Sequence, residues 1–363
     1  MKTLASSASH RDRHPRILVI RRDNIGDLVC TTPLLAALRK RYPAGYIAAL
    51  VNTYNKAVLD GNPDVDAVYA YEKGKHRASG RSIMSVYVDR LRLIMALRRE
   101  KFDYAILATP DYSPHALRLA RLIGARHVLG YARPGTARTR LDIALRHDRA
   151  VRGHHVEQVF GLLKALGING PPPPLRVISD PGERHRVEQA LSRLGPGTPV
   201  VGVHISARRK SQQWPASNFA ELIQAIATRH AARFLLLWAP GDADNPKHPG
   251  DDDKARVIEQ TCKGVPLLPC PTEALPRLIA ALSLCDIVVC ADGGAMHVAA
   301  ALGKPILCFF GDSPPEVWHP WGVPHRLLRS SSRDVSDISV DKALAAYMEL
   351  APTGARDQPR SPV

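Results

Sequence analysis

The sequence lacks the features of a membrane-spanning, secreted or metal-clustering protein. It has no run of about 18 uninterrupted apolar residues, so a membrane-spanning helix is not expected. Its first residues, MKTLASSASHRDRHPR, contain no apolar stretch of about 7–15 residues, so a signal peptide is not expected either. The six cysteines include no C-x-x-C pair, and we interpret them as buried thiols rather than disulfides or metal ligands.

Positive charge is concentrated in the first half of the chain, although the net charge of the whole is +16. Residues 1–170 hold 29 Lys and Arg against 14 Asp and Glu, whereas residues 171–363 hold 21 against 20. Because arginine binds phosphates and carboxylates in bidentate geometry, this half predicts an anionic partner or surface, with a solvated basic face as the alternative. Zinc-finger spacing, an RNP1-like segment and interleaved aromatics are missing, so nucleic acid is not an expected partner.

Short apolar stretches alternate with amphipathic ones through both halves of the chain. This alternation of strands and helices predicts an α/β fold with mainly parallel sheets. In the first half we expect strands at 16–21, 46–51, 67–71 and 104–108, a helix after the first strand and another at 83–99. In the second half we expect strands at 199–205, 234–238, 286–290 and 305–310, and helices at 217–229, 274–284, 295–302 and 339–350.

Four consecutive prolines interrupt this alternation after residue 170, where the charge balance also changes. Proline continues neither a helix nor a central strand, so a linker is expected there. Ligands of parallel sheets bind beyond the carboxyl ends of the strands, which favours two Rossmann-like halves facing a central cleft. The expected parts are a disordered basic arm (1–15), an N-terminal domain (16–170), a Pro-rich linker (171–177), a C-terminal domain (178–350) and a loose tail (351–363).

Two polar loops that follow expected strands contain candidate functional residues. In the first loop, Gly26 allows close backbone approach, and Asp27 lies near a helix N-terminus, where the helix dipole stabilises a carboxylate. An N-cap aspartate is the structural alternative. In the second loop, the three consecutive cations at 208–210 suit a phosphate leaving group, with a solvated basic loop as the alternative.

Two further loops follow strands in the second half. In the turn that begins at Asp292, the paired Gly293 and Gly294 let backbone N–H groups approach a pyrophosphate at a helix start. His297 would then sit on the first helical turn facing the same ligand, or serve as a core or capping histidine. The segment 309–320 combines a Gly/Pro turn with aromatic residues, and by itself indicates only a loop with a structural tryptophan.

In this order and spacing, the four segments together resemble glycosyltransferase family 9, the ADP-heptose:lipopolysaccharide heptosyltransferases of Gram-negative bacteria. The most specific parts are R-x-D-x-I-G-D-x-x-x-T-T-P, which begins at Arg21, and D-G-G-A-M-H-x-A-A-A-L-G-K-P, which begins at Asp292. The resemblance covers roughly residues 16–325. It implies the GT-B fold, with the acceptor bound by the first domain and the nucleotide-sugar donor by the second, and no metal or other cofactor.

The resemblance also implies roles for individual residues. Asp27 matches the general base of a single inverting displacement that moves heptose from ADP-heptose to a Kdo or heptose acceptor of the lipopolysaccharide inner core. Lys210 matches the catalytic lysine that stabilises the departing diphosphate, although Arg208 or Arg209 could replace it. The donor-binding residues implied in this way are Gly26, Ser206, Arg209, Lys210, Asp292, Gly293, Gly294 and His297.

The implied acceptor is an anionic lipopolysaccharide precursor of the Kdo–lipid A type. It would place the enzyme in the cytoplasm, peripherally on the cytoplasmic face of the inner membrane. The candidates for binding it are four basic residues of the first half, Arg92, Arg98, Arg99 and Lys101.

The chain departs from the family pattern at three places. Gly293 stands where Ser or Thr is usual, Ile205-Ser206 replaces Pro-Gly, and three residues rather than one separate Lys210 from Trp214. These departures bear on donor identity more than on fold. The alternatives are a related glycosyltransferase with another nucleotide sugar or acceptor, or a non-catalytic protein that binds an anionic glycolipid.

Overall fold

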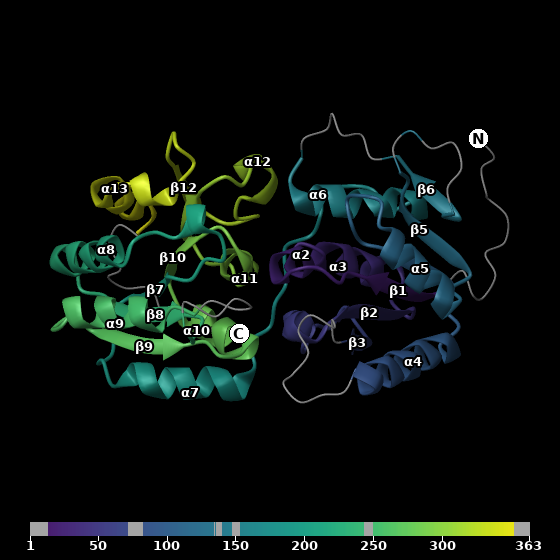
Figure 1. Ribbon diagram of the computed structural model, residues 1–363, viewed down its shortest axis with the longest axis horizontal. Helices are drawn as coiled ribbons and strands as arrows, with labels where there is room; N and C mark the ends of the chain where they lie inside the picture. The colour runs from purple at the N-terminus through teal and green to yellow at the C-terminus, as the bar shows by residue number, and fades with distance from the viewer. Residues whose placement is uncertain are drawn as a thin grey trace. The chain divides into compact units, whose positions relative to one another are not determined.

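The computed structural model describes residues 14–71, 83–133, 135, 140–146, 153–242 and 250–351. Within the described residues the chain forms two α/β units, each a parallel sheet flanked by helices (Figure 1). The N-terminal unit comprises the chain up to Asp180 together with Glu316–Trp321. The C-terminal unit comprises Pro181–Pro315 and the chain from Gly322 onward.

The N-terminal unit contains a six-stranded sheet in the order β3-β2-β1-β4-β5-β6, and every neighbouring pair is parallel. Alternate residues of a strand face opposite sides of the sheet. Leu18 and Ile20 of β1 therefore share one face, where they join a buried cluster with residues of α4 and α5. The strands are β1 (Arg16–Ile20), β2 (Tyr46–Asn52), β3 (Ala67–Tyr71), β4 (Tyr104–Leu107), β5 (His127–Tyr131) and β6 (Ile143–Leu145). The helices are α2 (Ile25–Val29), α3 (Thr32–Arg41), η1 (Thr53–Leu59), α4 (Ile83–Arg99), α5 (Pro114–Ile123), α6 (His155–Phe160) and η3 (Gly161–Leu166).

The C-terminal unit contains a second six-stranded parallel sheet in the order β12-β11-β10-β7-β8-β9. Its strands are β7 (Val200–His204), β8 (Arg233–Trp238), β9 (Leu267–Pro271), β10 (Ile287–Ala291), β11 (Ile306–Phe310) and β12 (His325–Arg329). Its helices are α7 (Pro181–Ser192), η4 (Lys210–Gln212), α8 (Ala216–Arg229), α9 (Asp252–Thr261), α10 (Leu275–Leu284), α11 (Gly294–Ala301), η5 (Val335–Asp337) and α13 (Val340–Leu350). A short helix, α12 (Pro315–Trp318), begins where the chain leaves this unit.

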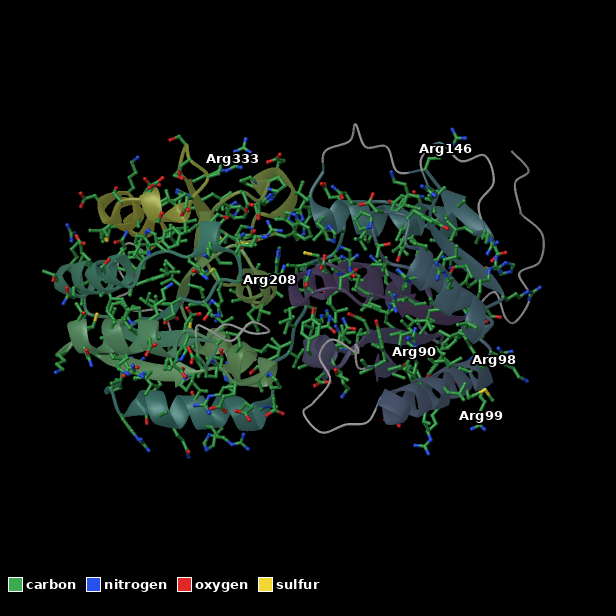
Figure 2. All side chains as sticks on the ribbon, viewed as in Figure 1. Arg90, Arg98, Arg99, Arg146, Arg208 and Arg333 are labelled. Atoms are coloured by element: carbon green, nitrogen blue, oxygen red, sulfur yellow. The ribbon has the colours of Figure 1, made fainter. Side chains whose placement is uncertain are left out.

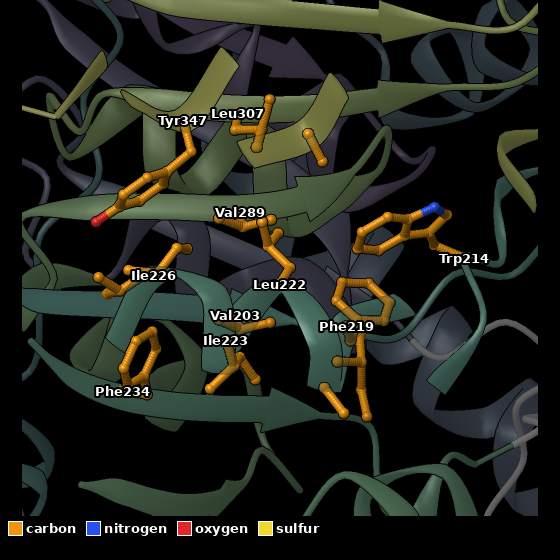
Figure 3. Packing of buried hydrophobic residues seen from close by; sticks show 14 of the residues in the cluster. Val203, Trp214, Phe219, Leu222, Ile223, Ile226, Phe234, Val289, Leu307 and Tyr347 are labelled. Atoms are coloured by element: carbon orange, nitrogen blue, oxygen red, sulfur yellow. The ribbon is translucent and has the colours of Figure 1, made fainter. Parts of the chain in front are cut away.

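An aromatic cluster organises the core of the C-terminal unit. Trp214 packs edge-on against Phe219 of α8 at 4.9 Å and lies 4.5 Å from Phe309 of β11, both distances joining ring centroids (Figure 3). The indole Nε1 donates to the carbonyl of Ile338 at 2.9 Å, so its polar atom is satisfied although the side chain is fully buried. This packing fixes the chain that follows the cationic loop at 208–210.

The two sheets share one topology. Counted from the first strand of each unit, the strands run 3-2-1-4-5-6 in both. This order reverses direction between the first and fourth strands, and open α/β sheets bind ligands at the carboxyl ends of the strands beside such a reversal. The reversal lies between β1 and β4 in the N-terminal unit and between β7 and β10 in the C-terminal unit.

The predicted α/β class and every predicted strand are confirmed, and no predicted strand boundary differs by more than one residue. The sequence prediction missed β5, β6, β9 and β12. Three of these are edge strands, which are only partly buried and therefore carry no continuous apolar run. In β9, Pro269 and Pro271 also argue against a strand, and proline is tolerated there because an edge needs hydrogen bonds on one side only.

The Pro-rich segment predicted as a linker packs onto the N-terminal unit. Leu175 and Val177 are buried, and the backbone N–H of Arg176 donates to Thr32 Oγ1 at 3.0 Å. The Arg176 guanidinium also pairs with Asp64 at 3.0 Å. The change of unit therefore comes after Asp180 rather than at 171–177, and Glu316–Trp321 groups with the N-terminal unit although we expected the second domain to be continuous. The predicted arm and tail fall almost wholly outside the described residues.

Candidate active site

Asp27 lies in α2, the short helix that opens directly after the loop following β1, at the reversal of the N-terminal sheet. Asn24 is the N-cap of α2, and Asp27 is the third residue of that helix. The Asn24 backbone N–H and its Nδ2 both donate to Asp27 Oδ2, at 2.9 and 3.0 Å. Asp27 is thus the acidic partner of a capping box rather than the N-cap of our structural alternative.

Arg21 connects Asp27 to the neighbouring strand. Its side chain is only 2% exposed, and its Nη2 donates to Asp27 Oδ1 at 2.5 Å. Its Nη1 donates to the carbonyl oxygen of Ala108, the residue that follows β4. The guanidinium therefore bridges the two strands whose order reverses, and it holds the carboxylate between them.

The charges around Asp27 favour its ionised form. Burial by itself raises the pKa of Asp27, but the Arg21 guanidinium acts in the opposite direction, as does His155 when it is protonated. The Asn24 backbone hydrogen bond also lowers the pKa. The net pKa of Asp27 lies below its ordinary value, so the group is a carboxylate at neutral pH.

A histidine that the sequence analysis missed reaches the same carboxylate. His155, the first residue of α6, has its Nε2 2.9 Å from Arg21 Nη2 and 3.5 Å from Asp27 Oδ1. Its ring stacks on Trp318 with centroids 4.2 Å apart and an interplanar angle of 22°. We refer to Arg21, Asp27, His155 and Trp318 as the Asp27 cluster.

The preceding histidine has a different environment. His154 is the N-cap of α6, where its Nδ1 accepts from the Val156 N–H at 3.1 Å. Its Nε2 lies 2.9 Å from the carbonyl oxygen of His319, and its ring stacks on Trp321 at 4.6 Å. Both histidines thus hold Glu316–Trp321 on the N-terminal unit, but only His155 reaches the carboxylate. In the sequence, the Gly153–Glu157 stretch carries a capping pattern that could have indicated the start of a helix.

A small pocket lies at the same carboxyl edge of the N-terminal sheet. Arg22, two residues beyond β1, has its guanidinium carbon 5.3 Å from the ring centroid of Tyr71, the last residue of β3. Burial raises the pKa of Tyr71, and the guanidinium groups of Arg22 and Arg90 oppose that rise. The pocket is lined by Arg22, Leu50, Tyr71, Arg90, Leu93, Ile94, Leu97 and Leu119.

Three of the predicted acceptor-binding residues lie at the opposite edge of this sheet. The helix α4 runs back from β3 to β4, so its last turn approaches the amino ends of the strands. Arg16, the first residue of β1, contacts Glu100 there, and the Arg98 Nη1 donates to the Leu122 carbonyl at 2.9 Å. Arg98 and Arg99 lie close together, apart from Arg90 (Figure 2). The structure therefore does not bring Arg98, Arg99 or Lys101 to Asp27, and Arg92 pairs with Asp89 at 3.5 Å on the surface of α4.

In the C-terminal unit, the loop after β7 carries the predicted cations on the surface. Lys210, the first residue of η4, is exposed. Arg209 is also exposed and pairs with Asp312 at 3.3 Å. Ser206 caps a neighbouring strand instead, because its hydroxyl accepts from the Ala239 N–H at 2.8 Å. The two cations remain at the reversal of the second sheet, beside the ends of β7 and β10.

The turn after β10 joins this loop through Gln212, which the sequence analysis did not single out. Gln212 Nε2 donates to Asp292 Oδ2 at 2.8 Å and to Ser313 Oγ at 3.0 Å. One buried amide thus connects the loops that follow β7, β10 and β11. Asp292 keeps a defined orientation because this amide occupies one of its oxygens.

The paired glycines begin α11 as predicted. Gly293 is its exposed N-cap and Gly294 its first helical residue, so backbone N–H groups at this helix start are available to an anion. A Cβ added at Gly293 would meet nothing within 4 Å. His297 lies one turn later and is buried, with its N–H bonded to the Gly293 carbonyl at 3.4 Å.

A second lysine near this loop also escaped the sequence analysis. Lys254 of α9 donates its Nζ to the Ile205 carbonyl at 2.9 Å and lies 5.0 Å from the ring centroid of Phe219. Burial lowers the pKa of Lys254 to about 8, against the opposing effect of Asp251. Burial, with a contribution from Lys254, lowers the pKa of His204 to about 4.

The structure also tests the expectations about metal sites, cysteines and membrane-spanning helices. In the part of the chain that the structure describes, no three His, Cys, Asp or Glu side chains come together as a metal site requires. That the protein needs no metal remains a prediction. All six cysteines are buried thiols, as expected. Among the described residues, none of the helices is both long and apolar enough to cross a bilayer.

Comparison with known proteins decides the family. The family model described as glycosyltransferase family 9 (heptosyltransferase) matches residues 90–347. The chain belongs to glycosyltransferase family 9. It is 26% identical over 302 residues to lipopolysaccharide heptosyltransferase 3 of Escherichia coli, covering 82% of this chain and 83% of that protein.

Solved structures agree with this family 9 fold. A family 9 glycosyltransferase from Veillonella parvula matches with a TM-score of 0.78 and 22% identity, over 93% of this chain and 97% of that one. The E. coli heptosyltransferase WaaC with ADP matches with a TM-score of 0.72 and 18% identity, over 92% and 99%. The fold is GT-B, built from two Rossmann-like units, and the protein is a glycosyltransferase.

Proposed function

We propose that this family 9 enzyme transfers heptose from ADP-heptose to a Kdo or heptose residue of an anionic lipopolysaccharide inner-core precursor. The observation that carries the proposal is the buried carboxylate of Asp27 at the strand reversal of the N-terminal sheet, in a chain whose family is described as heptosyltransferase. The relative in E. coli, lipopolysaccharide heptosyltransferase 3, supports the acceptor class. Such an acceptor would place the enzyme peripherally at the cytoplasmic face of the inner membrane.

In this mechanism Asp27 is the general base. Its carboxylate takes the proton of the acceptor hydroxyl while that oxygen attacks the anomeric carbon of the heptose. The new glycosidic bond forms as the bond from the anomeric carbon to the diphosphate oxygen breaks, and ADP leaves with the bonding electrons. Attack from the face opposite the leaving group inverts the anomeric configuration. The lowered pKa of Asp27 keeps the base ionised at neutral pH.

The donor is assigned to the C-terminal unit. We propose that the helix start at Gly293 and Gly294 binds the diphosphate through backbone N–H groups. The exposed Lys210, with Arg209 beside it, would neutralise the charge that develops on the leaving phosphate. Asp292, oriented by Gln212, would contact the heptose, and His297 would support the turn from below. We propose that no metal ion takes part.

We assign the acceptor's anionic group to the two arginines that line the small pocket of the N-terminal unit. Arg22 and Arg90 both act on the Tyr71 hydroxyl, so their guanidinium groups are near one another and could together bind a carboxylate or phosphate. Tyr71 ends β3 at the carboxyl edge of the sheet, which is the edge that carries Asp27. Arg22 and Arg90 are therefore better placed for the acceptor than Arg98, Arg99 and Lys101.

Calorimetric binding of ADP, UDP and GDP without metal tests the donor assignment. Selective ADP binding, unchanged by EDTA, is expected. A transfer assay with ADP-heptose and a Kdo–lipid A acceptor then tests the reaction, with the added heptose detected by mass spectrometry. Preference for UDP or GDP would point to another nucleotide sugar. Nucleotide binding without transfer to any core acceptor would refute the acceptor class.

Two arginines of one helix test the acceptor assignment. Loss of a charged hydrogen bond costs about 1.5–3 kcal/mol, so Arg90→Ala should raise the acceptor KM by about 10-fold or more and leave ADP affinity unchanged. Arg99→Ala replaces the exposed last residue of α4; it is the matched control and should leave both constants unchanged. A raised acceptor KM in Arg99→Ala, with an unchanged KM in Arg90→Ala, would return acceptor binding to Arg98, Arg99 and Lys101.

A further inference from the structure

The Asp27 cluster contains more side-chain contacts than a general base needs. Arg21 and Asp27 form an ion pair between residues only six positions apart, but His155 and Trp318 come from distant parts of the chain. The His155 Nε2 approaches Arg21 Nη2 to 2.9 Å, closer than its 3.5 Å to Asp27 Oδ1. The imidazole is thus aimed at the partner of the base rather than at the base itself.

The hydrogen-bonding capacity of the carboxylate explains why this matters. An ionised carboxylate offers about four acceptor positions on its two oxygens. Among the described residues, Asn24 donates twice to Oδ2 and Arg21 donates once to Oδ1. The remaining position is on Oδ1, and an acceptor hydroxyl needs it in order to give up its proton.

His155 is the side chain best placed to decide whether that position stays open. With Nδ1 protonated, its Nε2 accepts a hydrogen bond from Arg21 Nη2, which is a donor only. With Nε2 protonated, the same nitrogen would repel the guanidinium and turn its hydrogen toward Asp27 Oδ1. The 2.9 Å distance to Arg21 favours the first arrangement.

We propose that His155 is a positioning residue, which accepts from Arg21 and so keeps one lone pair of Asp27 Oδ1 open for the acceptor hydroxyl. The proposal rests on the proposed role of Asp27 as general base. It adds that Arg21 Nη2 must be shared between Asp27 and His155 to keep its orientation, while Nη1 donates to the Ala108 carbonyl. A guanidinium released by His155 would rotate about the Asp27 oxygen and close the position that the hydroxyl uses.

The stacking partner of His155 keeps the ring in this orientation. Trp318 lies 4.2 Å from the imidazole and nearly parallel to it, which blocks rotation of the ring out of its plane. Trp318 belongs to Glu316–Trp321, and the chain on both sides of that segment is part of the C-terminal unit. The loop after β11 contains Ser313, which accepts a hydrogen bond from Gln212. This loop continues directly into α12, whose last residue, Trp318, stacks on His155.

Two substitutions of His155 separate hydrogen bonding from stacking. His155→Phe keeps a ring against Trp318 and removes the acceptor, whereas His155→Gln places an amide oxygen near the position of Nε2. Because misplacement of a reacting group by about 1 Å can cost about 100-fold, we expect His155→Phe to lower kcat by about 10- to 100-fold with little change in either KM. His155→Gln should retain kcat within about threefold.

His154→Gln is the matched control, because His154 caps the same helix and stacks on the same segment without touching Arg21 or Asp27. It should lower the melting temperature and leave kcat unchanged. Normal turnover in His155→Phe would overturn the proposal. Equal losses in His155→Phe and His155→Gln, at unchanged melting temperature, would also overturn it, because the ring rather than its acceptor would then matter.

Crystal structures of the two His155 variants give a readout that needs no substrate. The Arg21 guanidinium should leave its place in His155→Phe and keep it in His155→Gln. An unmoved Arg21 in His155→Phe would refute the positioning role, even if the enzyme used another nucleotide-sugar donor. Absence of transfer by the unaltered enzyme, with Arg21 displaced in His155→Phe, would refute the proposed function and leave the positioning role supported.

Discussion

Replacement of Asp27 is expected to separate its chemical role from its structural one. Asp27→Asn keeps an oxygen for Arg21 and removes the negative charge and the basicity. Asp27→Ala removes the side-chain contacts to both Arg21 and Asn24. Because Arg21 is only 2% exposed, the alanine variant leaves a buried guanidinium without its carboxylate.

The two effects are of similar size but appear in different measurements. Loss of a general base slows turnover by about 10²–10⁴-fold, which corresponds to about 3–5 kcal/mol of activation free energy. Removal of one partner from a buried ion pair costs about 3–5 kcal/mol of folding free energy. For a unit of this size, that cost lowers the melting temperature by about 6–20 °C. Asp27→Asn should therefore lose turnover with a smaller loss of stability, and Asp27→Ala should lose both.

The assay combines single-turnover transfer, calorimetric ADP binding and thermal unfolding of the three proteins. Donor affinity should be unchanged in Asp27→Asn, because the nucleotide is assigned to the C-terminal unit. Turnover of Asp27→Asn within tenfold of the unaltered enzyme would refute the general-base role and leave Asp27 as a capping-box residue. Equal stability of all three proteins would refute the view that Arg21 depends on this carboxylate.

The pH dependence of stability gives a second measure of the same pair. The pKa of Asp27 is lowered in the folded protein relative to its ordinary value of 3.8. The carboxylate therefore contributes stability that is fully present above about pH 4 and is lost as the pH falls through the folded-state pKa. Asp27→Asn lacks this titration, so its stability should fall less between pH 4 and lower values. Parallel curves for the two proteins would contradict the lowered pKa.

Three substitutions in the C-terminal unit test its packing and its donor turn. Gly293→Ser should leave the melting temperature unchanged, because its Cβ meets open space, and any change in ADP affinity by calorimetry then reports the added hydroxyl. Gly311→Ala should destabilise the unit by about 1–3 kcal/mol, because the added Cβ would lie 2.4 Å from the Ser211 carbonyl oxygen. Chemical denaturation measures this loss, and unchanged stability would contradict the close approach. Trp214→Phe should cost about 1–3 kcal/mol in the same assay, because the buried Ile338 carbonyl loses its donor, and a neutral result would show that another group replaces it.

Local segments of the site were predictable because their residues are close in sequence. The helix start at Gly26–Asp27 and the turn at Gly293 each come directly after a buried strand, so their place at a sheet edge follows from the order of elements. The basic residues at 98–101 were assigned from charge alone, and charge does not indicate the edge of the sheet. The direction of α4 decides that, and it places them at the amino ends of the strands.

The sequence by itself determined the α/β class, the parallel central strands of both halves and the family motifs, because buried strands and strand-to-helix turns depend on neighbouring residues. Only the tertiary structure decided what surrounds Asp27. The contact between Arg21 and His155 spans 134 residues, and Trp318 reaches the same cluster from the segment between β11 and β12 of the second sheet. Such contacts depend on how helices and returning segments pack against the finished sheet, and no local pattern encodes that packing.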